Sequence, residues 1–534
     1  MNDSMPLVER VRICYKKLKA SVYFDKTLLP LRDNIVTFES ADIEKKLEKL
    51  AEYLESDDDQ AWQLYSKAII NAINAWVYPK KLNDPSSTKI IFNADDDEIK
   101  LEKAQYFIDL PVEGHILGVL WVISVGFALD NRSENSQSTM YEHSYGNRLR
   151  KTLINPKKND ITYSPNLFES YFTQYESWRD IALQQAKARL DKKQDALILT
   201  LDLKSFYYSV HIQKSDYDGI IRNFSDAVQN PWIRRVHEFV YQVLEQYSNI
   251  ISRISSDSEL QISKRTMLPI GFLPSCILSN WVLTPFDDAI IKRINPVYYG
   301  RYVDDIIIVD KVEKNSPLRK KAQKSGDEKL TTKDVIDYYF RACASDREVP
   351  DHEKCNQELF ITVPDAEKTR KQKKASDEAK RRSERSEKEA AQIYRINPAV
   401  LSSEHDEIKS DIQIQNGKVK VFYFHEGETR ALLDCFRTKI GQNASEFRLL
   451  PDMDRVLEKN DYSEIFQLTS TESPHKLRGV SGVAIDKFSL SKFLGKFRKV
   501  GNMIRDRNEN SFERDLCEIM NKRILIETHV PGTK

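Results

Sequence analysis

Residues 298–310, with the sequence YYGRYVDDIIIVD, decide the fold class of this chain. Asp304 and Asp305 stand between Tyr302–Val303 and the apolar run Ile306–Val309. This pattern predicts two short strands joined by a tight turn. Adjacent acids are common in hairpin turns. Between apolar strands, however, the two like charges repel each other, and a bound cation would relieve that repulsion.

A second acid interrupts another strand-like run. Residues 197–203 (LILTLDL) are apolar except for Thr200 and Asp202. An unpaired buried carboxylate is strongly unfavourable, so Asp202 needs a partner or a metal. The alternative is a strand-end Asp that caps the next element. Phosphoryl transfer with two divalent metals requires several carboxylates to converge on rigid elements.

The order of three features gives the chain its resemblance. LDLKSFYYSV (201–210) comes first, the loop and helix LPIGFLPSCILSN (268–280) second, and RYVDDIIIV (301–309) third. Together they resemble the palm motifs of reverse transcriptases over about 195–310. The resemblance implies an α+β, right-hand polymerase fold with fingers and palm, followed by a mainly helical thumb or C-terminal region.

The resemblance also implies a metal site. Asp202, Asp304 and Asp305 would form it, with Asp202 and Asp304 as direct ligands and Leu203 adding a backbone carbonyl. The cofactor would be two Mg²⁺ ions, with Mn²⁺ as a possible substitute. Magnesium prefers oxygen ligands, which suits this set.

Two further residues are implied to contact the incoming nucleotide. Tyr207 would lie under the sugar and exclude a 2′-hydroxyl, which selects deoxynucleotides. The alternative is a core aromatic like its neighbours Phe206 and Tyr208. Gly271 belongs to the second motif, whose loop and helix support the template and the nucleotide.

Basic residues before and after the palm are further nucleotide-binding candidates. SYGNRLR (144–150) resembles the fingers of bacterial defence-related reverse transcriptases, and Arg148 or Arg150 could hold the triphosphate because guanidinium matches phosphate oxygens. The alternative is a pair of surface arginines. Lys418 in NGKVKVFYF resembles the lysine of the fourth palm motif, with Lys420 as the other candidate. It would protonate or hold pyrophosphate.

The segment SLSKFLGKFRK (489–499) places three lysines at helical spacing: Lys492, Lys496 and Lys499. They are nucleic-acid-binding candidates on a thumb helix that grips a duplex. The alternative is an ordinary amphipathic helix packed in a bundle.

Composition shifts divide the chain into six expected parts. They are an N-terminal helical extension with the start of the fingers (1–135), fingers (136–195), palm (196–312), a charged insertion (313–411), palm completion (412–430) and a helical thumb or C-terminal domain (431–534). Within the insertion, 368–388 holds ten Lys/Arg against four Asp/Glu. Such a run is commonly a solvated helix, and the alternative is an arm that follows a nucleic-acid backbone.

Apolar spacing adds several secondary-structure expectations. Helices are predicted at Ile43–Leu54, at Ala61–Val77 and from about Leu167 to Leu190. A strand is predicted at Gly417–Phe424. Ile116–Leu129 is too short an apolar run to span a bilayer and is expected to be a buried core segment.

The bulk composition sets limits on the class of protein. The 534 residues are 40% hydrophobic and 31% charged, with a net charge of +1, so any nucleic-acid surface must be local. None of the six cysteines forms a CxxC pair. We expect reduced thiols in a cytoplasmic protein without a signal peptide and without a membrane partner.

Ile270 departs from the pattern of retroviral, retron and intron-encoded reverse transcriptases, which usually carry Gln before this glycine. The departure places the chain nearer the abortive-infection and defence-associated (unknown-group) reverse transcriptases. That implies antiphage defence, with RNA-directed or template-independent DNA synthesis. The expected partners are RNA or DNA and dNTPs, and further candidates are a small noncoding RNA, a second copy of the chain or a partner defence protein. The alternatives are a non-catalytic nucleic-acid-binding scaffold and a polymerase that makes RNA.

Overall fold

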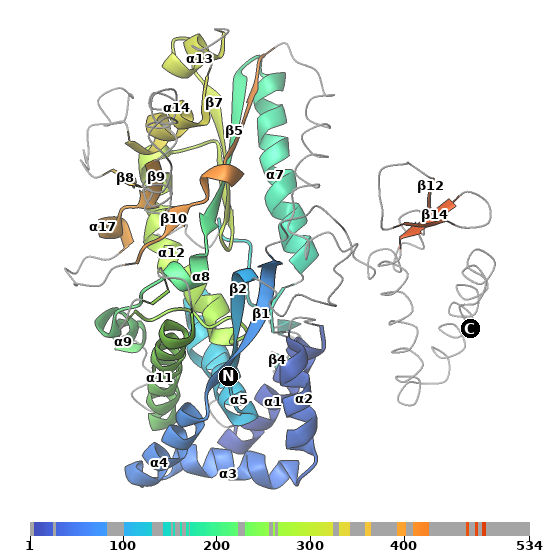
Figure 1. Cartoon of the computed structure of the whole chain (residues 1–534), viewed down its shortest axis with the longest axis vertical. Helices are drawn as coiled ribbons and strands as arrows, with labels where there is room; N and C mark the ends of the chain where they lie inside the picture. The colour runs from blue at the N-terminus through green and yellow to red at the C-terminus, as the bar shows by residue number, and fades with distance from the viewer. Residues whose placement is uncertain are drawn as a thin grey trace, which may run out of the picture. The chain divides into compact units, whose positions relative to one another are not determined.

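The computed structural model divides the chain into two compact units, Met1–Glu428 and Thr429–Lys534 (Figure 1). The structure describes residues 5–24, 28–82, 101–130, 143–150, 153–154, 161–162, 167–169, 171–222, 230–255, 260–261, 265–323, 330–341, 358–364, 392–401, 410–426, 466–468, 476–478 and 483–486. The basic run 368–388 and the lysines Lys492, Lys496 and Lys499 lie outside these residues. The six-part division of the chain stays a prediction.

The first unit begins with four helices and a hairpin. They are α1 (Leu7–Phe24), α2 (Leu29–Glu39), α3 (Ile43–Glu55), α4 (Asp59–Asn71), β1 (Asn74–Leu82) and β2 (Leu101–Asp109). In α3, the Asp42 side chain caps the helix by accepting a hydrogen bond from Lys45 N. Leu47, Leu50 and Leu54 form its buried stripe at helical spacing. The helix predicted at Ile43–Leu54 is confirmed.

The helix predicted at Ala61–Val77 is too long. The structure ends α4 at Asn71 and places Trp76 and Val77 in β1, which pairs antiparallel with β2. Pro79 follows closely, and the β-branched and aromatic residues before it favour a strand. Helical periodicity alone did not detect this change of structure.

The long apolar segment is buried, as predicted, and the structure shows it to be helical. α5 (Val112–Trp121), the π-helical turn η2 (Val122–Gly126) and α6 (Phe127–Asp130) follow one another without a break. Judged by length and composition alone, Val112–Asp130 is long and apolar enough to cross a membrane. However, 72% of its most apolar 18-residue stretch is buried inside the protein. Since α5 contacts α1, α11 and α12, the segment fits the core helix of a folded unit.

A seven-stranded sheet forms the centre of the first unit, in the order β6-β7-β5-β10-β9-β8, with β11 also on β5. Its strands are β5 (Asp195–Lys204), β6 (Tyr298–Tyr302), β7 (Asp305–Val312), β8 (Phe360–Pro364), β9 (Gln392–Ile396), β10 (Gln413–Ile414) and β11 (Lys420–Phe424). The strands expected at 197–203 and around Asp304–Asp305 are confirmed. The strand predicted at Gly417–Phe424 starts later, because residues 416–418 form a 3₁₀ turn.

Strand β5 occupies the middle of this sheet. All of β7 pairs with one side of β5, opposite Asp195–Asp202. The other side is shared between β11, opposite Ala196–Thr200, and β10, opposite Leu203 and Lys204. β5 is buried almost throughout, which explains why its sequence is a nearly continuous apolar run.

Among the described residues, five further helices precede β5 or connect β5 to β6. They are α7 (Tyr171–Asp191), α8 (Phe206–Ser209), α9 (Lys214–Arg222), α11 (Pro231–Ile254) and α12 (Leu273–Ile294). α7 contacts β5, β6 and β7, and Figure 1 shows it running beside β5 and β7. α12 has Pro274 in its first turn and ends at Ile294, and Asn295, with left-handed φ, caps it. The helices predicted from about Leu167 to Leu190 and within the motif 268–280 are confirmed as α7 and α12.

The remaining described elements are short. Between 313 and 411 they are α13 (Pro317–Ala322), α14 (Thr332–Ile336), η6 (Asp337–Arg341), β8, β9 and α17 (Pro398–Leu401). Residues 153–154 (β3) and 161–162 (β4) form a two-stranded pair. In the second unit, β12 (Phe466–Leu468), β14 (Val483–Asp486) and β13 (Lys476–Arg478) form a small sheet, which the expectation of helices for this region did not include.

Candidate active site

Antiparallel pairing brings two acid-bearing strand ends together. Asp202 of β5 lies directly opposite Asp305 of β7, and Cβ atoms of such a pair are about 4.5–5.5 Å apart. Asp304 occupies the turn between β6 and β7, and its backbone oxygen accepts a hydrogen bond from Leu203 N at 3.1 Å. The structure therefore gathers the three predicted acids and Leu203 at one end of the sheet.

The turn that carries Asp304 has a strained backbone. Val303 has a φ of 56°, in the left-handed region that a β-branched residue rarely adopts. Gly146 packs against it, and a Cβ at position 146 would lie 2.7 Å from Val303 Cγ2 and 3.0 Å from Val303 N. The absence of a side chain at Gly146 leaves room for the turn.

A Gly146→Ala variant is expected to lose about 1–3 kcal/mol of stability, because the added methyl must displace the Val303 backbone. Gly219→Ala in α9 is the control, because a Cβ there meets nothing within 4 Å. This variant is expected to gain roughly 0.5–1 kcal/mol of stability, since alanine is more stable than glycine inside a helix. Urea denaturation followed by circular dichroism measures both effects. Identical midpoints for Gly146→Ala and the wild type would show that the turn is not constrained by Gly146.

A buried ion pair supports the same turn. Arg301 in β6 binds both carboxylate oxygens of Asp287 in α12, with Nη2–Oδ2 at 2.7 Å, and both side chains are only 1% exposed. Arg301 Nη1 also donates to the Val303 carbonyl at 3.1 Å. The ion pair therefore holds the peptide that directly precedes Asp304.

Asn280 extends this network to residues 144–146. Its Nδ2 donates to Gly146 O at 2.9 Å, and its Oδ1 accepts from Ser144 Oγ at 3.0 Å and from Arg301 Nη1 at 3.1 Å. Arg301, Asp287 and Asn280 were not among the predicted site residues. Two features of the sequence could have indicated this network. Arg301 is the one charged residue of β6, and α12 carries polar side chains in a strongly apolar sequence.

Lys418 reaches the site from the other side of β5. Its Nζ lies 2.9 Å from Asp202 Oδ2, and Gln415 N donates to Asp202 O at 2.8 Å. Lys420, the other candidate, instead lies in β11, where it is paired in register with Thr200 of β5. The structure thus places Lys418 next to the acids, where its charge offsets repulsion among them.

The donor chemistry fits a magnesium site, since carboxylates and a backbone carbonyl are oxygen ligands. Within the part of the chain that the structure describes, no group of three or more His, Cys, Asp or Glu is arranged to hold a metal ion. One oxygen of Asp202 is directed at Lys418 instead. A metal ion at Asp202 would take the place of this ammonium.

Tyr207 lies five residues after Asp202 and reaches the segment 144–150. It is less buried than Phe206 and Tyr208 on either side, and Asn147 Nδ2 is 3.5 Å from its hydroxyl. Desolvation raises the pKa of Tyr207 well above its usual value, and the nearby Cys276 and Asp304 raise this pKa further. The Tyr207 hydroxyl therefore stays neutral.

Gly271 has a backbone reason to be glycine. Its φ of 91° is unfavourable for other residues, and a Cβ would lie 3.1 Å from Leu28 Cδ2. The loop is docked on β2, because Ile108 N donates to Ile270 O at 2.9 Å. A nucleotide contact at Gly271 stays a prediction.

The two candidate arginines differ in their surroundings. Arg148 donates to Asp130 Oδ1 at 2.7 Å and to Ser144 O at 3.0 Å, so its charge is already paired. Arg150 has an exposed side chain, and its backbone N bonds to Leu167 O. Triphosphate binding by either one stays a prediction.

Residues 142–331 match the family model of reverse transcriptase (RNA-dependent DNA polymerase). The matched part contains β5, α12, β6, β7 and all three acids, whereas Lys418 lies beyond it. A comparison with curated proteins found no match. The chain thus contains a reverse transcriptase domain, which supports RNA-directed DNA polymerase activity and implies nucleic acid and dNTPs as substrates.

Proposed function

We propose that the chain is an RNA-directed DNA polymerase that adds deoxynucleotides at Asp202, Asp304 and Asp305. The observation that carries the proposal is the placement of these three residues at one end of the sheet, inside the reverse transcriptase match. Two Mg²⁺ ions, when bound there, would activate the primer hydroxyl and stabilise the departing pyrophosphate.

The protein side chains would orient the reactants. The rigid strands β5 and β7 fix the acids, and Arg301 fixes the turn between β6 and β7. Lys418, released from Asp202, would hold pyrophosphate or give it a proton. Arg150 is better suited than Arg148 to meet the triphosphate, because Arg148 is engaged with Asp130.

Primer extension tests this proposal directly. The purified chain is incubated with MgCl₂, dNTPs and a DNA primer annealed to an RNA template, and we expect extended DNA. Binding of the hybrid without extension, on this and on self-primed templates, would favour the non-catalytic scaffold. Equal use of rNTPs and dNTPs would identify an RNA polymerase instead.

Tyr207 is proposed to exclude ribonucleotides by its ring. A Tyr207→Ala variant is expected to raise rNTP use relative to dNTP use by about 10- to 100-fold, because the pocket no longer clashes with a 2′-hydroxyl, and steric discrimination of this kind is worth about 1–3 kcal/mol. The measurement is kcat/KM for a matched rNTP and dNTP pair. Tyr207→Phe keeps the ring and should keep the selectivity. An unchanged ratio in Tyr207→Ala would assign the tyrosine to the core alone.

We further propose that this polymerase serves antiphage defence, with unusual or template-independent synthesis. Ile270 supports this: its partly buried side chain packs on the hydrophobic core and offers no polar contact where retroviral, retron and intron-encoded reverse transcriptases usually carry Gln. Cells that express the chain, or its Asp304→Asn variant, are challenged with phage. Protection that requires the intact acid supports the role, and equal plating on both strains contradicts it.

A further inference from the structure

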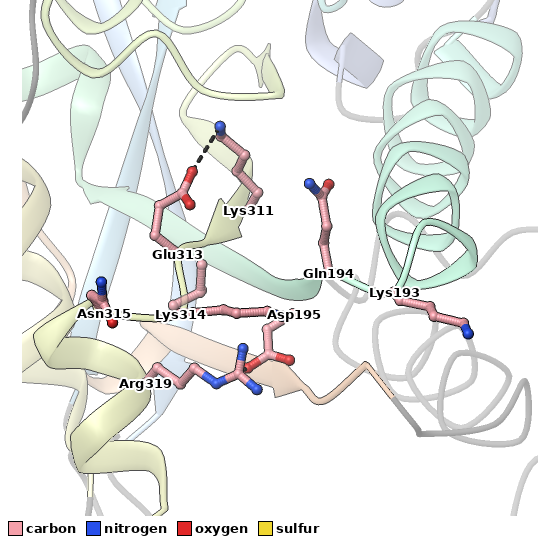
Figure 2. Close-up of a pocket in the computed structure, with 9 residues that line it drawn as sticks. Lys193, Gln194, Asp195, Lys311, Glu313, Lys314, Asn315 and Arg319 are labelled. Carbon is pink, nitrogen blue, oxygen red and sulfur yellow. Dashed lines mark ion pairs between the residues drawn. The ribbon is translucent and has the colours of Figure 1, made fainter.

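A second polar site lies at the opposite end of β5. A pocket of about 270 Å³ is lined by Lys193, Gln194, Asp195, Lys311, Val312, Glu313, Lys314, Asn315 and Arg319 (Figure 2). These residues come from the α7–β5 turn, the end of β7 and the start of α13. Asp195 and Asp202 are seven positions apart on one strand, which separates them by about 23 Å. The pocket is therefore distinct from the site of the three acids.

The pocket wall carries an excess of positive charge. Four basic side chains stand against two acidic ones, Asp195 and Glu313, which leaves two positive charges in excess. Glu313 forms an ion pair with Lys311, with an Nζ–Oε1 distance of 2.8 Å. Among the described residues, no acid pairs with Lys193 or Lys314, and both side chains are exposed.

The negative charge of the buried acid in the pocket, Asp195, is balanced by nearby hydrogen-bond donors. Asp195 is fully buried and accepts from Tyr423 OH at 2.6 Å and from Glu426 N at 3.0 Å. Arg319 Nε adds a longer contact at 3.4 Å, and Figure 2 shows the two side chains pointing toward each other. Because these donors surround the carboxylate, its repulsion of a second anion is weakened.

Arg319 keeps hydrogen-bonding capacity. Its side chain is 16% exposed, and its two ion pairs, to Asp195 and Glu426, are both at 3.4 Å. They use Nε and Nη2, whereas a guanidinium has five N–H donors. Within the described part of the chain, Nη1 has no assigned acceptor. A partly buried guanidinium with donors to spare is well suited to bind a phosphate oxygen.

Gln194 supplies an independent sign of a missing ligand. Its Oε1 is buried without a hydrogen-bond partner among the described atoms, and such atoms are uncommon in native proteins. Rotation of the amide would turn its NH₂ group, which donates two hydrogens, toward the same position. A bound anion would then satisfy the group.

We propose that this pocket binds a phosphate group of a nucleic-acid strand, at a position remote from the three acids. Lys314 and Arg319 contact the phosphate, Gln194 donates from the wall, and Lys193 stands at the rim, pointing away from Asp195 (Figure 2). The claim that the phosphate belongs to an RNA strand rests on the proposed function, whereas the claim that the pocket binds phosphate does not.

The salt dependence of RNA binding tests the proposal. Fluorescence anisotropy measures the affinity for a labelled single-stranded RNA over a range of KCl concentrations, with EDTA present so that no synthesis occurs. For Lys193→Gln/Lys314→Gln we expect the slope of log K against log[salt] to fall in magnitude by about 0.7–1.4. Affinity at about 0.1 M KCl should fall roughly 5- to 25-fold.

The matched control removes two charges elsewhere. Lys45→Gln/Lys67→Gln changes exposed lysines of α3 and α4 and is expected to leave the slope and the affinity unchanged. The melting temperature of each variant reports on folding, and Lys193→Arg/Lys314→Arg should restore the slope. Since EDTA prevents catalysis, a chain without polymerase activity can still pass this test, and an active polymerase can still fail it.

Inorganic tripolyphosphate distinguishes a strand from a small anion. If tripolyphosphate raises the melting temperature of the wild type but not of the double variant, and RNA affinity is equal in both, the pocket takes a small phosphate compound. If neither RNA affinity nor the tripolyphosphate effect depends on Lys193 and Lys314, the phosphate site is refuted.

Discussion

Asp304→Asn is expected to lower the rate of DNA synthesis by at least about 10²–10³-fold, the loss typical when one charge-stabilising group leaves a preorganised site. The amide keeps the shape of the side chain but removes the negative charge that would hold a divalent cation. The fold should survive, because the hydrogen bond from Leu203 uses the backbone oxygen of Asp304. Single-turnover primer extension measures the rate.

Asp310→Asn is the matched control for this experiment. Asp310 lies in the same strand, β7, but opposite Leu197 rather than Asp202, away from the acids. Its rate should stay close to that of the wild type. If Asp304→Asn extends primers as fast as Asp310→Asn does, the assignment of the metal site to the turn is wrong.

The second large effect is expected on stability. Arg301→Met should lower the free energy of unfolding by about 3–5 kcal/mol, because it leaves Asp287 as an uncompensated buried charge. It also removes the donor to the Val303 carbonyl. Denaturant unfolding followed by circular dichroism gives the shift in the transition of the first unit.

A double variant separates charge from packing. Arg301→Met/Asp287→Leu removes both charges, and replacing a whole buried ion pair is often neutral or stabilising. We expect it to recover much of the lost stability, yet to extend primers slowly because the Val303 turn is less firmly held. A double variant as unstable as Arg301→Met would show that packing rather than charge explains the loss.

The part of the fold predicted from sequence is the part governed by local pattern. The apolar run before Asp202 and the hairpin around Asp304 and Asp305 required only alternation and turn signals, and both strands are where they were expected. The end of α4 was misplaced because Trp76 and Val77 fit a helical stripe as well as a strand, and pairing with β2 decided the outcome.

The candidate site was predictable only in part for a similar reason. Motif order placed three acids near one another, and the register of β5 and β7 agrees with that. The ion pair between Arg301 and Asp287 depends on how α12 crosses the sheet, which no local pattern encodes. Nor could spacing show that Lys418 meets Asp202 across 216 positions of sequence.

The pairing of β5 with β11 has a consequence for synthesis on the ribosome. Asp195 and Tyr423 touch across 228 positions, so one edge of the apolar strand β5 stays open until those later residues emerge. At about 5–20 residues per second this takes roughly 10–45 s. During that time the nascent chain exposes an edge that can pair with other chains. A chain shortened to the end of the family match at residue 331 would keep that open edge permanently and should aggregate.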